Sequence, residues 1–187
     1  MKLRTFNTMT DLVAVVALFE LCFGEAPWFE RFVTRELIEW FTQLASNPDT
    51  IFLVVGHQGE IVGCSVAHAL AGKPDVAELV DEDPERTLYM AELFVHPDYR
   101  RYGIGVQLTT ERFRIGWEHG FRRAVARTSV VQGIIRSLYC GRYDFEVVIS
   151  QDVVSTKWID GEEQEVPDTR VIMAGPIPLQ VIGAVSA

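Results

Sequence analysis

The alternation of apolar and polar positions divides the chain into successive helices and strands with no linker between them. Residues 2–6 predict a short first strand, and residues 11–23 and 31–45 carry apolar side chains at the three- and four-residue spacing of one helix face. Thr10 and Asp11 offer a cap for the first helix. The second helix is expected to end near Asn47 and Pro48, because proline cannot continue it.

The middle of the chain predicts a hairpin followed by a helical crossover. Residues 51–55 and 61–69 read as strands joined by a glycine-bearing turn, and the acidic stretch 75–85 is expected to form the far loop. Strand 87–95, helix 105–119 with Gly120 as its C-terminal cap, and strand 124–130 then form a crossover. Such a connection predicts that its two strands are parallel neighbours.

The last third of the chain predicts a helix at 134–141 and strands at 147–155 and 170–174 on either side of an Asp160-Gly161 turn. The order of elements indicates an α/β fold with a mixed, mostly antiparallel sheet of six to seven strands and about four flanking helices. We expect one domain over residues 1–187, with an extended tail from about residue 176.

Composition narrows the classes of protein that the chain could belong to. The 187 residues, 48% of them hydrophobic, suffice for a core without disulfides or metals. The three cysteines (Cys22, Cys64 and Cys140) are widely separated and odd in number, which favours a reducing, cytoplasmic location. No two histidines have metal-ligand spacing, so we expect no metal. The apolar run 11–23 contains Glu20 and is too short for a membrane span, which argues against a membrane protein.

The net charge of −9 disfavours nucleic acid as a partner, because phosphate affinity needs clustered Lys and Arg. The charge suits a cationic partner better, although acidity also serves solubility alone.

The most informative segment is the loop between strand 87–95 and the following helix. It holds Gly103 and Gly105, and glycine lets a ligand approach the backbone closely. The first N–H groups of a helix lack partners within it and, with the helix dipole, favour an anion such as a phosphate. Arg100 and Arg101 can add charge-assisted bonds, or form only a solvated basic turn. The chain has neither the Walker lysine pattern nor a Rossmann glycine motif.

This segment, LFVHPDYRRYGIG at 93–105, resembles motif A of the GNAT N-acetyltransferases. The resemblance extends over residues 2–174 as an order of elements and over 87–145 in residue detail. It implies acetyl-CoA, or another acyl-CoA, as co-substrate, with its pantetheine arm between two splayed strands that end near Val95 and Val130. The implied binding groups are the backbone N–H groups of Arg101, Tyr102, Gly103, Ile104 and Gly105, and the backbone of Phe94 and Val95. The side chain of Arg100 remains a further candidate for the phosphates, on the strength of its charge.

The segment 132–139 resembles the family's second helix motif, which begins at Gln132 and ends at Tyr139. The match implies that Gln132 lies at the cofactor and that Tyr139 is the general acid near the sulfur. An extra residue before Phe145 leaves Cys140 and Tyr143 as alternatives.

Two further side chains are candidates for handling protons. Glu92 lies on the strand beside the implied site and is the candidate general base; it could instead be solvated or paired with an arginine. Among the histidines only His68, at the end of a strand, merits a test.

The resemblance therefore predicts an N-acetyltransferase that transfers an acyl group to the primary amine of a small molecule. A peptide or protein amine, a catalytically silent acyl-CoA-binding module and an unrelated nucleotide-phosphate binder are the alternatives, and a homodimer is left open. In the family, acceptor specificity comes from segments that correspond to 23–41 and 153–170. These are rich in aromatic residues, namely Trp28, Phe29, Phe32, Trp40, Phe41 and Trp158, which could line a pocket or belong to the core.

Overall fold

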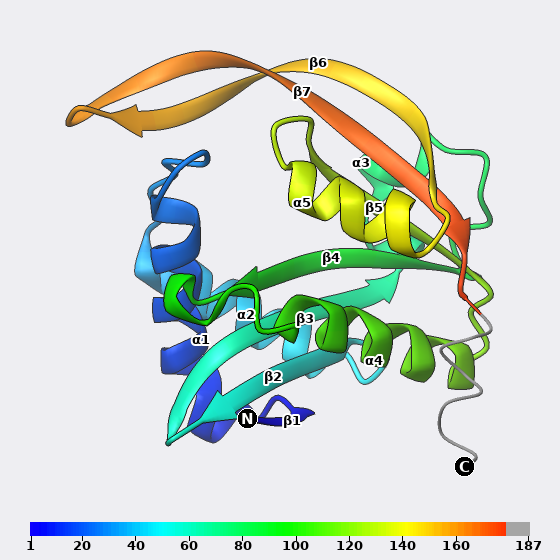
Figure 1. The fold of residues 1–187 in the computed structure, drawn as a ribbon, viewed down its shortest axis with the longest axis horizontal. Helices are drawn as coiled ribbons and strands as arrows, with labels where there is room; N and C mark the ends of the chain where they lie inside the picture. Colours follow the sequence, from blue (N-terminus) through cyan, green and yellow to red (C-terminus); the bar gives the residue numbers. More distant parts are fainter. Residues whose placement is uncertain (179–187) are drawn as a thin grey trace.

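The computed structural model describes residues 1–178, which fold around one seven-stranded sheet in the order β1-β2-β3-β4-β5-β7-β6 (Figure 1). Only β4 and β5 are parallel, so the predicted mixed α/β fold is confirmed. The strands are β1 (Lys2–Thr5), β2 (Ile51–His57), β3 (Glu60–Ala69), β4 (Thr87–Val95), β5 (Arg123–Ser129), β6 (Glu146–Ile159) and β7 (Glu162–Pro176). The helices are α1 (Thr8–Gly24), α2 (Thr34–Ser46), α3 (Pro74–Ala77), α4 (Ile104–Glu118) and α5 (Gly133–Arg136).

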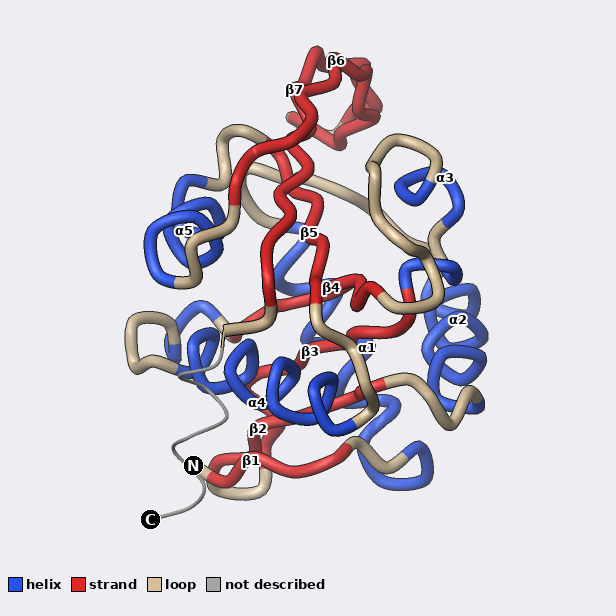
Figure 2. Tube along the Cα trace, turned by 90° about the vertical axis from the view of Figure 1, so that its right-hand side faces the viewer, coloured by secondary structure: helices blue, strands red, loops and turns tan. Residues whose placement is uncertain are grey.

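Helices cover the two faces of the first four strands (Figure 2). Side chains of a strand alternate between faces, and β2 sends Ile51, Leu53 and Val55 into a core with α4. Its neighbours Phe52 and Val54 pack instead among the side chains of α1 and α2. The helix between β4 and β5 therefore lies on the face opposite to α1 and α2.

Strands β4 and β5 pair only at their beginnings. Their parallel register covers Thr87 to Tyr89 on β4, and beyond this point the strands separate. At the same place β4 has a bulge of one residue against β3. Val66 pairs with Glu92 and His68 pairs with Tyr89, so two residue steps on β3 correspond to three on β4. A bulge bends its strand and increases its twist, so the bulge marks where the gap between β4 and β5 opens.

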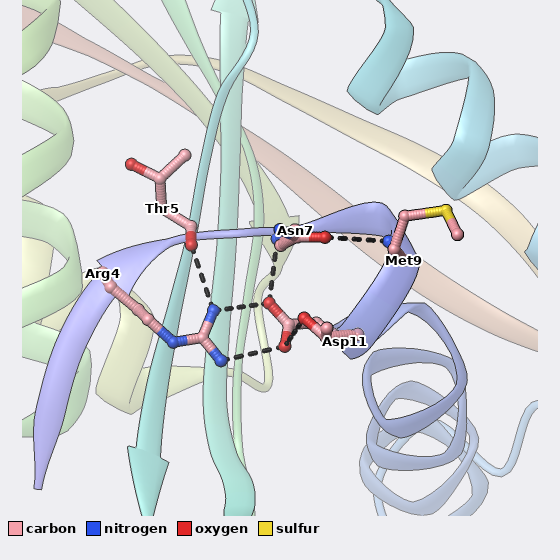
Figure 3. Close-up of polar contacts among 6 residues, drawn as sticks. Arg4, Thr5, Asn7, Met9 and Asp11 are labelled. Atoms are coloured by element: carbon pink, nitrogen blue, oxygen red, sulfur yellow. Dashed lines mark hydrogen bonds and ion pairs between the residues drawn. The ribbon is translucent and has the colours of Figure 1, made fainter.

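The start of α1 differs from the prediction. The helix begins at Thr8, and its cap is Asn7, whose side chain accepts a hydrogen bond from the Met9 N–H at 2.9 Å. Asp11, predicted as part of the cap, is buried and paired with Arg4, and it accepts the Asn7 N–H at 2.8 Å (Figure 3). Its carboxylate thus ties β1 to the first turn of α1.

Three other segments depart from the expected elements. The acidic stretch 75–85, predicted as a loop, begins within the short helix α3. The predicted helix 134–141 is one α-helical turn, α5, followed by a π-helical turn over Ser137–Arg142. Strands β6 and β7 are longer than expected and form a hairpin that arches above the other strands, closed by Asp160 and Gly161. Most of the predicted tail, residues 179–187, lies outside the described part of the chain.

Candidate active site

The loop before α4 forms a concave row of backbone N–H groups. Arg101 and Gly103 both have positive φ, of 68° and 79°, in a turn that directs successive N–H groups to one side. No group of residues 1–178 accepts a hydrogen bond from the N–H groups of residues 101 to 105. A Cβ at Gly103 would meet nothing within 4 Å, so the space in front of the turn is open. The geometry fits a phosphate at the helix N-terminus.

The side chains of this loop take different positions. Arg101, Tyr102 and Gly103 are exposed, whereas Ile104 is buried beneath the turn and anchors it in the core shared with α4. The Arg100 guanidinium is paired with Glu25, and its Nε donates to the Val95 carbonyl at 3.0 Å. Arg100 therefore links the loop to the segment between α1 and α2, rather than standing free for an anion.

The peptide groups at the end of β4 define one wall of the gap. The His96 N–H donates to Val62 on β3, and antiparallel pairs alternate, so the peptide groups of Phe94 also face β3. Those of Leu93 and Val95 face the gap. The Val95 carbonyl already accepts from Arg100 and from the Cys22 thiol at 3.3 Å, which leaves the Val95 N–H and the Leu93 groups to pair with a ligand.

Glu92 lies on β4 where the gap opens and is only partly exposed. Burial and, to a smaller extent, the negative charge of Glu30 raise the pKa of its carboxyl to about 8, against the opposing charges of Arg112 and Lys73. A carboxyl with a pKa near neutrality can both accept and release a proton, which is what a general base requires. A carboxyl whose pKa is strongly shifted by burial and by neighbouring charges is also typical of functional sites.

The π-helical turn absorbs the extra residue noted in the sequence, and it determines where the three candidate acids lie. Tyr139 is buried, and its hydroxyl accepts a hydrogen bond from Arg112 at 3.2 Å. The Tyr143 hydroxyl bonds with Thr110 at 2.8 Å and its ring packs on Phe113, whereas Cys140 is half-buried at the edge of the same core. Tyr139 is the candidate that is connected to β4.

That connection is Arg112 on α4, a residue that the sequence analysis missed. Arg112 is fully buried, and its Nη1 donates to the carbonyls of Val66 at 3.0 Å and Glu92 at 2.9 Å. Its Nη2 donates to the hydroxyls of Thr109 and Tyr139. The arginines of α4 look like ordinary solvated residues in the sequence. Arg112 could have been identified only from the β4 bulge, whose carbonyls need a hydrogen-bond donor beneath them.

The two remaining sequence candidates lie at the ends of elements. Gln132 precedes α5 and is partly buried, and its N–H donates to Ser129 at 3.0 Å. His68 ends β3 against the Tyr89 ring, with its Nδ1 at 2.8 Å from the Ala69 carbonyl. Burial lowers the pKa of His68, and no contact in the described residues joins it to Glu92 or Tyr139.

Residues 12–141 match the model of the acetyltransferase (GNAT) family, which spans more than half of the chain. The chain belongs to the GNAT family. Among curated proteins none matches its sequence significantly.

Solved structures share the GNAT fold at low sequence identity. An N-acetyltransferase from Staphylococcus aureus Mu50 superposes with a TM-score of 0.73 at 16% identity, covering 95% of this chain and 98% of the other. A ribosomal-protein-alanine N-acetyltransferase from Brucella melitensis gives 0.70 at 18% identity, covering 94% and 99%. A putative acetyltransferase from Salmonella typhimurium, solved with its cofactor acetyl-CoA, gives 0.69 at 17% identity, covering 95% and 94%.

A pocket of about 350 Å³ lies between the α1–α2 segment and the β6–β7 hairpin of this GNAT chain. It is lined by Glu20, Gly24, Phe29, Glu30, Arg31, Phe32 and Trp158. Burial raises the pKa of the Glu30 carboxyl, and the charges of Arg170 and Lys157 oppose that shift. The indole N–H of Trp158 is buried and has no acceptor among the described residues. Acidic and aromatic groups therefore face one opening.

The hairpin is fastened to the α1–α2 segment at this pocket. The backbone N–H of Trp158 donates to the Phe29 carbonyl at 2.6 Å, and the Lys157 ammonium donates to the Pro27 carbonyl at 2.6 Å. The Arg31 guanidinium stacks over the Trp158 ring at 3.8 Å. Through these contacts Trp158, near the far end of the hairpin, lines the pocket. In Figure 1 that end of the hairpin lies beside the segment between α1 and α2. Phe41 and Trp40, by contrast, belong to the core around α1.

No helix in the described part of the chain is both long and apolar enough to cross a membrane.

Proposed function

We propose that this GNAT protein is an acetyl-CoA-dependent N-acetyltransferase that transfers an acyl group to the primary amine of a small molecule. The observation that carries the proposal is the arrangement along β4. The strand opens away from β5, places Glu92 at the point of opening, and leads to the loop whose N–H groups at residues 101 to 105 are free.

The residues of this chain fit the cofactor. The free N–H groups of residues 101 to 105, with no Cβ at Gly103, would hold the pyrophosphate at the start of α4. The Val95 N–H and the peptide groups of Leu93 would pair with the pantetheine amides in the gap. When bound, acetyl-CoA supplies an acyl group activated as a thioester.

Proton handling would fall to two ionisable groups that Arg112 connects, the Glu92 carboxyl and the Tyr139 phenol. Glu92 takes the proton of the incoming ammonium, because only the neutral amine has a lone pair to form the new C–N bond. As the C–S bond breaks, the Tyr139 hydroxyl donates its proton to the departing sulfur. Burial raises the pKa of Tyr139 and keeps the phenol protonated for this step. The proton that the new amide nitrogen loses returns to Tyr139.

The pocket between the α1–α2 segment and the hairpin would take the acceptor. Glu30 lies close enough to raise the pKa of Glu92, so a cation bound at Glu30 is near the base. Glu20 adds a second carboxylate, and Phe29 and Trp158 offer apolar faces to the carbon skeleton. The free indole N–H of Trp158 would donate a hydrogen bond to a carbonyl or hydroxyl oxygen of the same molecule. An amine with an apolar body and one such oxygen matches this set of groups.

The proposal is tested by thiol release from acetyl-CoA, followed with a thiol-reactive dye, against a panel of amines. The panel contains aliphatic and aromatic primary amines, amino acid amides and short peptides with free N-termini. We expect turnover with small amines, and loss of turnover in Glu92→Gln. The Glu60→Gln variant, changed at the exposed first residue of β3, is the matched control and should keep full activity.

The other outcomes separate the alternatives. Turnover restricted to peptides would make the acceptor a protein N-terminus. Thermal stabilisation by coenzyme A without turnover of any amine would indicate a silent binding module. Displacement of coenzyme A by ATP or NAD would point to a nucleotide-phosphate site instead, and would refute the proposal.

A further inference from the structure

Arg112 is a buried cation with no carboxylate bonded to it in the described residues. The side chain is completely inaccessible, and its partners are two carbonyls, from Val66 and Glu92, and two hydroxyls, from Thr109 and Tyr139. Its Nε is buried without a partner. Burying a charge is costly, and apolar side chains of similar volume often replace buried ions without loss of stability. Packing alone therefore does not account for an arginine at this position.

The contacts of Arg112 join the two halves of the site. One guanidinium nitrogen holds β4 at the bulge where the gap to β5 opens, through the backbone of the candidate base. The other nitrogen donates to the phenol oxygen of the candidate acid. Because that oxygen accepts a hydrogen bond from Arg112, the phenol hydrogen is left to donate elsewhere.

We propose that Arg112 is a positioning residue for acyl transfer: it fixes the β4 bulge and orients the Tyr139 hydroxyl so that its proton points into the gap. This inference rests on the proposed function. Arg112 itself touches neither the acceptor nor the acyl donor; it acts through Tyr139 and through the backbone of Glu92.

The chain offers a matched control for the link to Tyr139. Thr110, on the same helix, holds the hydroxyl of the other buried tyrosine, Tyr143, at 2.8 Å. The Arg112 pair joins α4 to the π-helical turn and the Thr110 pair joins α4 to the residue that follows this turn, but only the Arg112 pair continues to β4. A merely structural role predicts similar effects when either pair is broken, whereas a positioning role predicts an effect on turnover for Arg112 alone.

The experiment is a double-mutant cycle on full-length protein with acetyl-CoA and the best amine of the panel. The variants are Arg112→Gln, Arg112→Lys, Tyr139→Phe, Arg112→Gln with Tyr139→Phe, and Thr110→Val. We expect Arg112→Gln to lower kcat by about 10- to 100-fold, a range typical of a misplaced catalytic group, with little change in KM for acetyl-CoA. In the Tyr139→Phe background the same substitution should cost only about threefold, because its main target is already gone.

The pH profile gives a readout that a structural role would not move. Arg112 lowers the pKa of Glu92, which is also faced by Glu30 from the α1–α2 segment and by Lys73 after β3. Arg112→Gln should therefore shift the acidic limb of kcat/KM to higher pH. Arg112→Lys keeps the charge and should hold the limb in place while recovering part of kcat.

The outcomes distinguish this inference from the function on which it rests. Wild-type protein that turns over no amine would overturn both. If the wild type is active, two results would overturn only the positioning role. One is that Arg112→Gln lowers kcat equally in the wild-type and the Tyr139→Phe backgrounds. The other is that Thr110→Val lowers kcat as much as Arg112→Lys does. Thermal melting shows which variants fold, and Arg112→Lys keeps the test decisive should Arg112→Gln fail to fold.

Discussion

Replacing Glu92 by Gln should remove a pH dependence of stability that this one carboxyl creates. Burial is the main reason that the pKa of Glu92 is about 8 in the folded protein, well above the ordinary glutamate value of 4.5. Between these pH values the folded state keeps a proton that the unfolded state has lost. The unfolded state then binds fewer protons, so the free energy of unfolding falls as the pH rises through this window.

The size of the effect follows from the distance between the two pKa values. Each pH unit inside the window lowers the free energy of unfolding by at most about 1.4 kcal/mol, and the whole window amounts to on the order of 5 kcal/mol. Glutamine carries no titrating proton and makes no such contribution. The Glu92→Gln variant should therefore gain stability relative to the wild type as the pH rises from about 5 to about 9.

The assay is urea unfolding of both proteins across that pH range, together with kcat/KM at each pH. His68, whose lowered pKa does not depend on Glu92, remains in both proteins and cancels in the difference. We expect kcat/KM to fall by roughly 100- to 1000-fold in the variant and to lose its limb near the pKa of Glu92. A stability difference that stays constant with pH would refute the raised pKa, and full activity would refute the base.

Three further predictions address the cofactor site, the N-terminal ion pair and the acceptor pocket. Gly103→Glu should weaken coenzyme A binding by at least about 100-fold in titration calorimetry, because a carboxylate would stand among the N–H groups meant for phosphate. Asp11→Asn should lower the free energy of unfolding by about 2 kcal/mol at neutral pH, since Asp11 accepts charged hydrogen bonds from Arg4. Glu30→Gln should raise KM for a cationic amine about tenfold without changing KM for acetyl-CoA.

Each of these predictions has its own control. Gly59→Glu places the same residue at a turn glycine with φ of 89° and open surroundings, so it should reproduce the backbone strain of Gly103→Glu but bind coenzyme A normally. The pKa of Asp11 is lowered to about 2, so its contribution should be present above 3.8 and lost as the pH falls through about 2. A KM effect of Glu30→Gln that is as large for a neutral acceptor would contradict its role in binding a cation.

Local patterns predicted most of the fold because the signal for each helix or strand lies in residues that are adjacent in the sequence. The parallel pairing of β4 with β5 was predicted from the helical crossover between them. Gly120 was predicted to end α4 because glycine readily adopts positive φ, and its φ is 93° in the structure. The cap of α1 was mispredicted because Asp11 is a good capping residue by type. Its carboxylate instead satisfies Arg4 from β1, a partner that no local pattern identifies.

The site was less accessible to sequence reasoning, for a related reason. The loop before α4 could be predicted, since its glycines and N–H groups are contiguous in the chain. The π-helical turn could not, because an inserted residue can be absorbed as a π bulge, a kink or a longer loop. Whether Tyr139, Cys140 or Tyr143 is the buried acid depended on which of these occurs.

The β4 bulge connects the features that sequence reasoning left separate. One extra residue between Tyr89 and Glu92 turns the end of β4 away from β5, which opens the gap and places Glu92 at its edge. The same displacement leaves two carbonyls above α4 for which a buried arginine is the donor. A fork of guanidinium nitrogens can serve those carbonyls and still reach a tyrosine, whereas a single ammonium cannot. The bulge thus accounts for the gap, the base and the arginine as consequences of one local irregularity in the strand.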